Sequence, residues 1–403
     1  MAHIFPFTAL RPVPRAAAAV AAVPYDVVSA EDARRLAEGN PLSFLHVSRA
    51  EIDLPPGTDP YSDQVYERAN ENFRDLRARA PLIVEDAPSV YVYRLEMGGH
   101  VQGGVAACFS LDEYDADVIK KHEKTRPDKE DDRTRHMLAI GAQTGPVFLT
   151  YAASAPIDAL SARAMTAAPL FDFAAPDEVK HTIWRISDQE AQAFVRAFDE
   201  VGALYIADGH HRAASAARTR RALSGRGMGE HDRMLAVAFP DTQVQILPYN
   251  RVIRDLNGLT PEEFLERLRS HATIQAGGPA SSSRKGQVGV YLDGAWHTIQ
   301  FSSPGDAEGA ATLDVTLLQD LVLGPILGVG DVRTDKRIDF VGGLKGTREL
   351  QRLVDSGEFA VAFSMHPVTI HDLMRIADEG GIMPPKSTWF EPKLRDGLLS
   401  HLI

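Results

Sequence analysis

The spacing of apolar and polar residues along the chain predicts a mixture of short strands and helices. Apolar runs and two-residue alternation predict strands at 89–96, 101–109, 147–151, 182–186, 203–207, 233–239, 245–247, 289–292 and 360–363. Apolar positions recurring every three to four residues predict helices at 30–38, 62–79, 133–142, 190–200, 211–223, 315–323 and 370–379. Strands and helices interspersed in this way are typical of an α+β or α/β fold, and they exclude an all-helical bundle.

Turn-forming residues divide these elements further. Gly98 and Gly99 separate two strand patterns, so we expect 89–96 and 101–109 to pair as a hairpin. The serine- and glycine-rich stretch 277–286 is expected to be a surface loop. We predict three regions: an N-terminal α/β region (1–111), a central core (112–240) and a C-terminal α/β region (241–403).

The amino-acid composition of the chain limits the classes of protein to which it can belong. With 403 residues, 44% hydrophobic and 24% charged, the chain is typical of a globular protein of one large or two smaller domains. Its net charge of −12 argues against general nucleic-acid binding. No apolar run is long enough to span a membrane, and we identify no signal peptide. The single cysteine, Cys108, suggests a reducing compartment, so we expect a cytoplasmic protein.

The densest chemistry lies between the strand at 203–207 and the helix at 211–223. Asp208, Gly209, His210, His211 and Arg212 follow one another there. A strand, a glycine turn and a helix start present free N–H groups and partial positive charge to an anion. Asp208 could instead only cap the helix and Gly209 only supply a positive φ. Because a cap needs one such residue and not five, we interpret the turn as a phosphate-handling site.

A second charged cluster contains His122, Glu123, Lys124 and Thr125, in a turn expected to lead into the helix at 133–142. Most such runs of mixed charge are simply solvated. Here Pro127 and the flanking apolar segments indicate a constrained turn. Since cations flank Glu123, its pKa should stay low, and a role as general base would depend on substrate alignment.

A third cluster, Lys386, Ser387 and Thr388, follows two prolines and could place an ammonium and two hydroxyls around a phosphate or Mg²⁺. The alternative is a packed tail anchored by Trp389 and Phe390. No P-loop, Rossmann fingerprint or nucleophile elbow occurs in the chain. The adjacent histidines face apart on a helix, which makes zinc binding there unexpected.

The order of these clusters resembles the core shared by the partitioning protein ParB, sulfiredoxin and the free L-serine kinases. The segments Val23-Pro-Tyr-Asp-Val, His122-Glu-Lys-Thr, Asp208-Gly-His-His-Arg and Met383-Pro-Pro-Lys-Ser-Thr together resemble a family of long relatives of those kinases. The resemblance covers nearly the whole chain. It implies an α+β, ParB/sulfiredoxin-like mixed core with N- and C-terminal α/β elaborations.

The resemblance also implies roles for individual residues. Nucleotide phosphates would be held by Gly209, His210, His211 and Arg212, and Lys124 and Thr125 would also bind the nucleotide. Asp208 and His210 would contact Mg²⁺ or the substrate hydroxyl, and Glu123 would accept the hydroxyl proton. The substrate or its phosphate would meet His122, Lys386, Ser387 and Thr388.

On this resemblance we expect a kinase that uses ATP or ADP with Mg²⁺ and phosphorylates a small metabolite, free L-serine first among candidates. Two alternatives stay open: a non-catalytic nucleotide-binding switch of the ParB type, and a nucleotide hydrolase or phosphotransferase with another acceptor. The chain is much longer than a minimal serine kinase, and the additional segments could reshape the acceptor site. The sequence does not select the nucleotide, the oligomeric state or a role for Cys108.

Overall fold

The computed structural model describes residues 1–79, 82–301 and 308–403. Its contacts group them into two compact units, Met1–Val244 together with Pro392–Ile403, and Gln245–Glu391. Both units contain helices and sheets, which confirms the predicted α+β class. The division into three regions stays a prediction. Within the described ranges, no helix is long and apolar enough to cross a membrane.

A large mixed sheet forms the centre of the first unit. Eight of its strands, in the described part of the chain, follow one another in space as β6 (Ile119–Lys120), β11 (Leu204–Asp208), β8 (Val147–Tyr151), β12 (Arg233–Pro240), β5 (His100–Ser110), β4 (Tyr91–Met97), β10 (Lys180–Arg185) and β9 (Phe171–Ala174). A further strand, β1 (Ile4–Phe5), pairs with β5. The predicted hairpin is confirmed: β4 and β5 are antiparallel, and Gly98 and Gly99 between them have φ of 56° and 88°.

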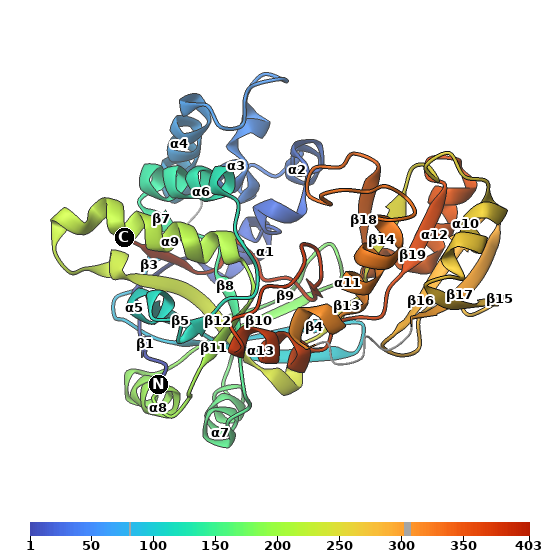
Figure 1. Cartoon of the computed structure of the whole chain (residues 1–403). Helices are drawn as coiled ribbons and strands as arrows, with labels where there is room; N and C mark the ends of the chain where they lie inside the picture. The colour runs from blue at the N-terminus through green and yellow to red at the C-terminus, as the bar shows by residue number, and fades with distance from the viewer. Residues whose placement is uncertain (80–81, 302–307) are drawn as a thin grey trace. The chain divides into compact units, whose positions relative to one another are not determined.

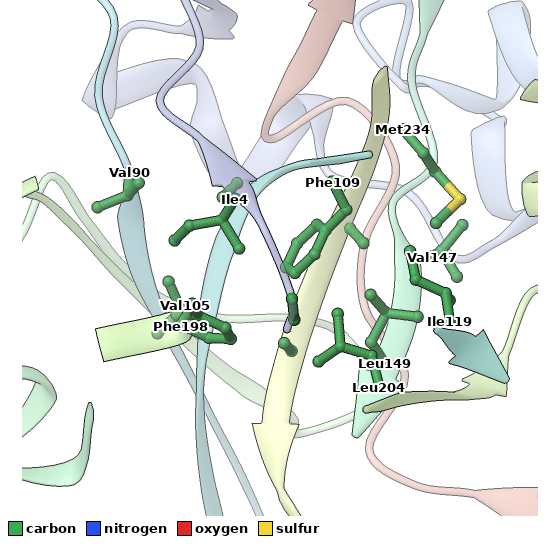
Figure 2. Packing of buried hydrophobic residues seen from close by; sticks show 14 of the residues in the cluster. Ile4, Val90, Val105, Phe109, Ile119, Val147, Leu149, Phe198, Leu204 and Met234 are labelled. Atoms are coloured by element: carbon green, nitrogen blue, oxygen red, sulfur yellow. The ribbon is translucent and has the colours of Figure 1, made fainter. Parts of the chain in front are cut away.

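One face of this sheet carries a continuous hydrophobic core, part of which is seen in Figure 2. Phe109, Val147, Leu149 and Leu204 contribute from the strands, and Phe198 from a helix. The helices that contribute to this core are α5 (Leu111–Asp115), α6 (Pro127–Ile140), α7 (Ala155–Ala164), α8 (Asp188–Phe198) and α9 (His210–Leu223). Removing this apolar surface from water is the main force that holds the sheet and helices together.

A smaller sheet and the N-terminal helices complete the first unit. The sheet contains, in spatial order, β3 (Leu82–Val84), β2 (Ala9–Pro12), β21 (Ser400–Leu402) and β7 (Ala142–Gln143). The helices are α1 (Ala17–Val20), α2 (Ala30–Ala37), α3 (Leu45–Ser48) and α4 (Asp63–Arg79). They have their own apolar cluster, in which the rings of Phe44 and Phe73 pack edge to face. Helix α6 packs against both α4 and α9 (Figure 1).

The second unit is built on a six-stranded antiparallel sheet. Its strands, in spatial order, are β15 (Ala272–Ala276), β17 (Ala295–Phe301), β16 (Gln287–Leu292), β19 (Val361–Ser364), β14 (Tyr249–Ile253) and β18 (Ile338–Gly342). Two short strands, β13 (Ile246–Leu247) and β20 (Trp389–Phe390), pair separately. The helices are α10 (Pro261–Leu268), α11 (Asp314–Leu318), α12 (Gly346–Asp355) and α13 (Ile370–Asp378), and a π-helical turn, Gln319–Leu323, continues α11.

One predicted boundary is wrong in a way that matters for the site. The charged run after Pro127 was expected to be a turn before a helix at 133–142, but α6 already begins at Pro127. Proline suits the first helical turn because its missing N–H has no partner there. Acidic residues in that turn, Asp128 and Glu130, are stabilised by the helix dipole. The helix ends at Gly141, whose φ of 65° closes it.

Candidate active site

The pairing of β6 with β11 brings two of the predicted clusters together. The two strands are parallel, with Leu204 opposite Ile119 and Tyr205 opposite Lys120. Both strands therefore end at the same edge of the sheet, and each is followed by a helix, α6 or α9. The loop after β6 carries His122 and Glu123, and β11 ends at Asp208, which Gly209 follows. Residues about 85 positions apart in sequence thus form one site. Two hydrogen bonds join the segments, from the backbone N–H groups of His122 and Arg126 to the side chains of His210 and His211.

The turn at Gly209 is shaped by its backbone. The register of β11 against β8 shifts between Ile206 and Asp208, a bulge of the kind that re-aims a side chain. Gly209 then has φ of 91°, which side-chain-bearing residues avoid. A Cβ here would lie 3.2 Å from the guanidinium carbon of Arg212. Glycine at the N-cap offers no side-chain acceptor, so the turn supplies no cap of its own for the first N–H groups of α9.

His122 and His210 form a buried pair at this turn. They are 2% and 5% exposed, and their ring centroids are 4.4 Å apart in an edge-to-face arrangement. The backbone N–H of His122 donates to Nε2 of His210 at 3.4 Å. Burial lowers the pKa of His122 to about 4, and burial together with His122 lowers the pKa of His210 well below its ordinary value. Both rings are therefore neutral near pH 7.

Neutral His210 has a defined tautomer in this arrangement. Because Nε2 accepts a hydrogen bond, the ring proton is on Nδ1. Nδ1 lies 3.9 Å from Oε2 of Glu123, whose side chain is 41% exposed. The separation exceeds a hydrogen bond, and a small side-chain rotation would close it. Glu123 is thus partly open to solvent and lies near an N–H donor of His210.

Arg212 occupies the inside of the turn. Its Nη1 donates to the carbonyl of Pro146 at 2.6 Å, and its Nη2 lies 3.3 Å from Oδ2 of Asp26. The side chain is 5% exposed. Its Nε has no hydrogen-bond partner among the described residues. Burial alone would lower the pKa of Arg212, but Asp26 and Asp208 raise it, so the guanidinium stays charged.

Asp208 is held by a lysine from the C-terminal segment of the same unit. Nζ of Lys393 lies 2.9 Å from Oδ2 of Asp208. Burial would raise the pKa of Asp208, but Lys393 and Arg212 together hold it below its ordinary value. The turn therefore combines one carboxylate with two fixed positive charges.

Asp396 is a further buried carboxyl group near Arg212. It is 2% exposed, and its backbone pairs with Ala22 in both directions. Burial raises the pKa of Asp396 to about 7, with Asp26 adding to the rise and Arg212, Arg133 and Arg395 opposing it. The group therefore changes protonation near neutral pH.

Asp396→Asn is expected to change how stability depends on pH. The unfolded chain has an aspartate pKa of about 4, below the folded value, so the folded protein loses stability as pH rises from about 4 to about 7. For one group the slope is at most about 1.4 kcal/mol per pH unit, and it vanishes above the folded pKa. Urea unfolding at pH 4 to 9 should show this contribution in the natural protein and not in the variant. The exposed Asp188→Asn serves as control, and identical pH profiles for the Asp396 variant and the natural protein would contradict the assignment.

The remaining predicted residues of the first unit have different surroundings. Nε2 of His211 accepts the backbone N–H of Arg126 at 3.1 Å and so caps the start of α6. The hydroxyl of Thr125 donates to Glu130. Lys124 is exposed on the same loop. These contacts tie the loop after β6 to the first turns of both helices.

Lys386, Ser387 and Thr388 belong to the second unit. Lys386 is exposed with φ of 60°, and the hydroxyl of Ser387 donates to the carbonyl of Pro384 at 2.6 Å. Their predicted role at the phosphate-handling turn stays a prediction.

Three charged residues of the site received no role in the sequence analysis: Asp26, Lys393 and Asp396. Asp26 lies in the Val-Pro-Tyr-Asp-Val segment that supported the family resemblance, and this was the only signal for it. Lys393 and Asp396 are about 185 residues from the turn along the chain, so no local pattern could connect them to it.

The described acidic and histidine side chains of the site form no ready cage for a metal ion. Among residues 1–79, 82–301 and 308–403, no three histidine, cysteine or acidic side chains are gathered in a way that could hold an ion. The carboxylate of Asp208 is already paired with Lys393. These residues do not fit a magnesium ion held mainly by the protein, and the assignment of Asp208 as a metal ligand stays a prediction.

Comparison with known protein families shows to which family the chain belongs. The family model described as "protein of unknown function (DUF1015)" matches residues 4–316. The chain belongs to the DUF1015 family. The match includes both the loop after β6 and the turn after β11. No curated protein matches the sequence.

Several solved structures have a distantly similar fold. A free serine kinase in complex with AMP is 16% identical with a TM-score of 0.38, over 72% of this chain and 91% of the kinase. A conserved hypothetical protein from Pyrococcus furiosus is 16% identical, with a TM-score of 0.38 over 74% and 95%. SbnI with a C-terminal truncation from Staphylococcus aureus is 12% identical, with a TM-score of 0.38 over 74% and 87%. Similarity at this level does not establish a shared activity.

Proposed function

We propose that this DUF1015 protein is a nucleotide-dependent phosphotransferase whose reaction takes place at the turn between β11 and α9. The observation that carries the proposal is the proximity of Glu123 to this turn, with Oε2 3.9 Å from Nδ1 of His210. A carboxylate that is partly exposed thus lies beside a helix N-terminus suited to phosphate. Phosphoryl transfer needs mainly alignment of the reacting groups and compensation of their negative charge.

The phosphate is proposed to bind at the start of α9. The N–H groups of the first helical turn point along the helix axis, and Gly209 leaves them without a side-chain cap. The guanidinium of Arg212 and the ammonium of Lys393 add positive charge on the inner side of the turn. When bound, the nucleotide would supply the phosphoryl group that is transferred.

Glu123 is proposed as the general base that accepts the proton of the acceptor hydroxyl. Glu123 lies in the loop after β6 with its side chain 41% exposed, whereas the side chain of Asp208 is 28% exposed and is paired with Lys393. His210 would act as a positioning residue, since its Nδ1–H can orient the carboxylate while its Nε2 is held by the backbone of His122. Such a neutral partner fixes the base without supplying a positive charge that would lower its basicity.

The finer identity of the protein is also part of the proposal. The order β6, loop, α6, β8, β11, turn and α9 supports a ParB/sulfiredoxin-like core in the first unit. The family resemblance of the four motifs supports ATP or ADP as donor and free L-serine as acceptor, giving O-phospho-L-serine.

An assay of the full chain tests the proposal. The protein is incubated with L-serine and the magnesium salt of ATP or ADP, and ³¹P NMR follows the products. Formation of phosphoserine is expected. Release of inorganic phosphate without dependence on an acceptor would instead indicate a nucleotide hydrolase, and binding without turnover would indicate a nucleotide-binding switch. Absence of nucleotide binding would overturn the proposal.

A further inference from the structure

The second unit contains a buried arginine with unusual surroundings. Arg251 lies on β14, opposite Phe340 of β18 and Phe363 of β19, and is 4% exposed. Its Nη1 donates to the carbonyl of Tyr249, and its Nη2 donates to the carbonyl of Lys386 at 2.9 Å. Two carbonyls use only part of the five N–H donors of a guanidinium.

Arg251 differs from the other buried arginines in having no acid partner. Four arginines are buried among the described residues. Three of them pair with a carboxylate: Arg11 with Glu85, Arg212 with Asp26, and Arg395 with Asp177. No described carboxylate pairs with Arg251, and burial, only partly offset by Tyr249, lowers its pKa to about 10. A buried charge without a counter-charge is costly, which calls for an explanation.

The residue whose carbonyl accepts from Arg251 carries a second positive charge. This residue, Lys386, is exposed and forms no ion pair with a described residue. Its ammonium lies 5.6 Å from the centre of the Tyr249 ring, and the guanidinium carbon of Arg251 lies 5.6 Å from the centre of the Phe340 ring. Tyr249 and Arg251 are two residues apart on β14, so both point to the same face of the sheet. Two positive charges are thus found near these rings, whereas the acid of the same segment, Glu391, accepts from a neighbouring indole N–H.

The surrounding turn is held in one conformation. Lys386 has φ of 60°, a region that residues other than glycine rarely adopt. Two prolines precede it, and the hydroxyl of Ser387 closes the turn onto Pro384. The indole of Trp389 covers Gly342, where a Cβ would come within 2.9 Å of the ring, and lies 5.0 Å from the ring of Tyr249. The segment that carries Lys386 is therefore held in one conformation, and the aromatic rings of Tyr249 and Trp389 lie beside it.

We propose that Arg251 and Lys386 form an oxyanion-binding site of the second unit, which takes the carboxylate or phosphate of a small molecule. A planar guanidinium donates in parallel to two oxygens of such a group, and a lysine beside it adds a point charge. The oxyanion supplies a counter-charge to Arg251, with which no described carboxylate pairs. Both residues that carry this inference belong to the second unit.

The test measures ligand binding at the second unit through a signal from Trp389. The chain has three tryptophans, so full-length protein labelled with 5-fluorotryptophan gives three ¹⁹F signals, and Trp389→Phe identifies the one from this site. Inorganic phosphate, L-serine and L-serinamide are titrated separately. A saturable shift of the Trp389 signal is expected with phosphate, with L-serine or with both. L-Serinamide, which lacks the carboxylate, should give none, and comparison of the arms identifies the preferred oxyanion.

Matched variants assign the effect to the two cations. Arg251→Met and Lys386→Met should raise the dissociation constant about tenfold or more, the range for charge-assisted bonds. Arg254→Met, which removes an exposed guanidinium just after the same strand, should leave it unchanged. If Arg251→Met fails to fold, the affinity of Lys386→Met decides the test, because Lys386 is exposed and its replacement should leave the fold intact.

The proposal is overturned if neither phosphate nor L-serine shifts the Trp389 signal saturably, or if folded Lys386→Met binds as the natural protein does. In that case Arg251 serves only to hold the turn at Lys386. Failure to form phosphoserine, by contrast, would count against the first-unit proposal and leave this result unaffected.

Discussion

Glu123→Gln is expected to lower kcat for phosphotransfer by about 10²–10⁴-fold, the usual contribution of a general base. Glutamine keeps the size of the side chain and can still meet His210, but it cannot accept the hydroxyl proton. Because the side chain is 41% exposed and belongs to the loop after β6, the fold should tolerate the change. Nucleotide affinity, measured by calorimetry, should stay near that of the natural protein, since the phosphate is proposed to bind to α9.

The control for this variant is Asp188→Asn, which removes an exposed acid from the first turn of α8 and should leave kcat unchanged. The pH profile provides a second readout, because loss of the base should abolish the acidic limb of kcat. Full activity in Glu123→Gln would show that this acid is only part of a solvated charged loop. Loss of nucleotide affinity with kcat unchanged would assign it to binding.

Arg212→Met is expected to lower the free energy of unfolding by about 3–5 kcal/mol, the cost of removing one partner from a buried ion pair. Methionine fills a similar volume but leaves Asp26, Asp208 and Asp396 without the guanidinium that lies among them. The loss should be smaller at acid pH. Arg212 lowers the pKa values of Asp208 and Asp396, so without it both are higher in the folded state and protonation restores stability as pH falls.

Arg220→Met on the same helix is the matched control. Arg220 also makes two ion pairs, but its partners Asp112 and Asp115 are exposed, so the expected loss is no more than about 1 kcal/mol. Chemical unfolding of the three proteins at pH 5 and pH 8 makes the comparison. Equal losses for both arginines, or no dependence on pH for the Arg212 variant, would contradict the role given to the buried charges.

Elements with strong local patterns could be predicted closely. The strand at 147–151 has the bounds of β8, and the helix at 211–223 begins one residue after the start of α9. The start of α6 was misplaced because the six residues after Pro127 are all charged and carry no apolar period. There, proline at the first turn and acids near the N-terminus stabilise the helix, and these signals are independent of periodicity.

Pairings between distant segments could not be predicted in this way. Strand β6 has only two residues, and β14, which carries Arg251, was not predicted at all. Both are recognisable only through their partners, β11 for the one and β18 and β19 for the other. Short strands gain their stability from neighbouring strands and not from their own residues, so their sequences contain little signal.

The amino-acid sequence by itself determined the chemistry of the turn at 208–212 and the presence of a glycine where φ is 91°, because both depend on neighbouring residues. The tertiary structure alone decided that Glu123 lies beside His210, that Asp26 and Lys393 complete the charges of the turn, and that no described carboxylate pairs with Arg251. The physical reason is that electrostatic interactions depend on the distance between the charges and on their burial. For residues far apart in sequence, both quantities are fixed only when strands pair and the chain folds back on itself.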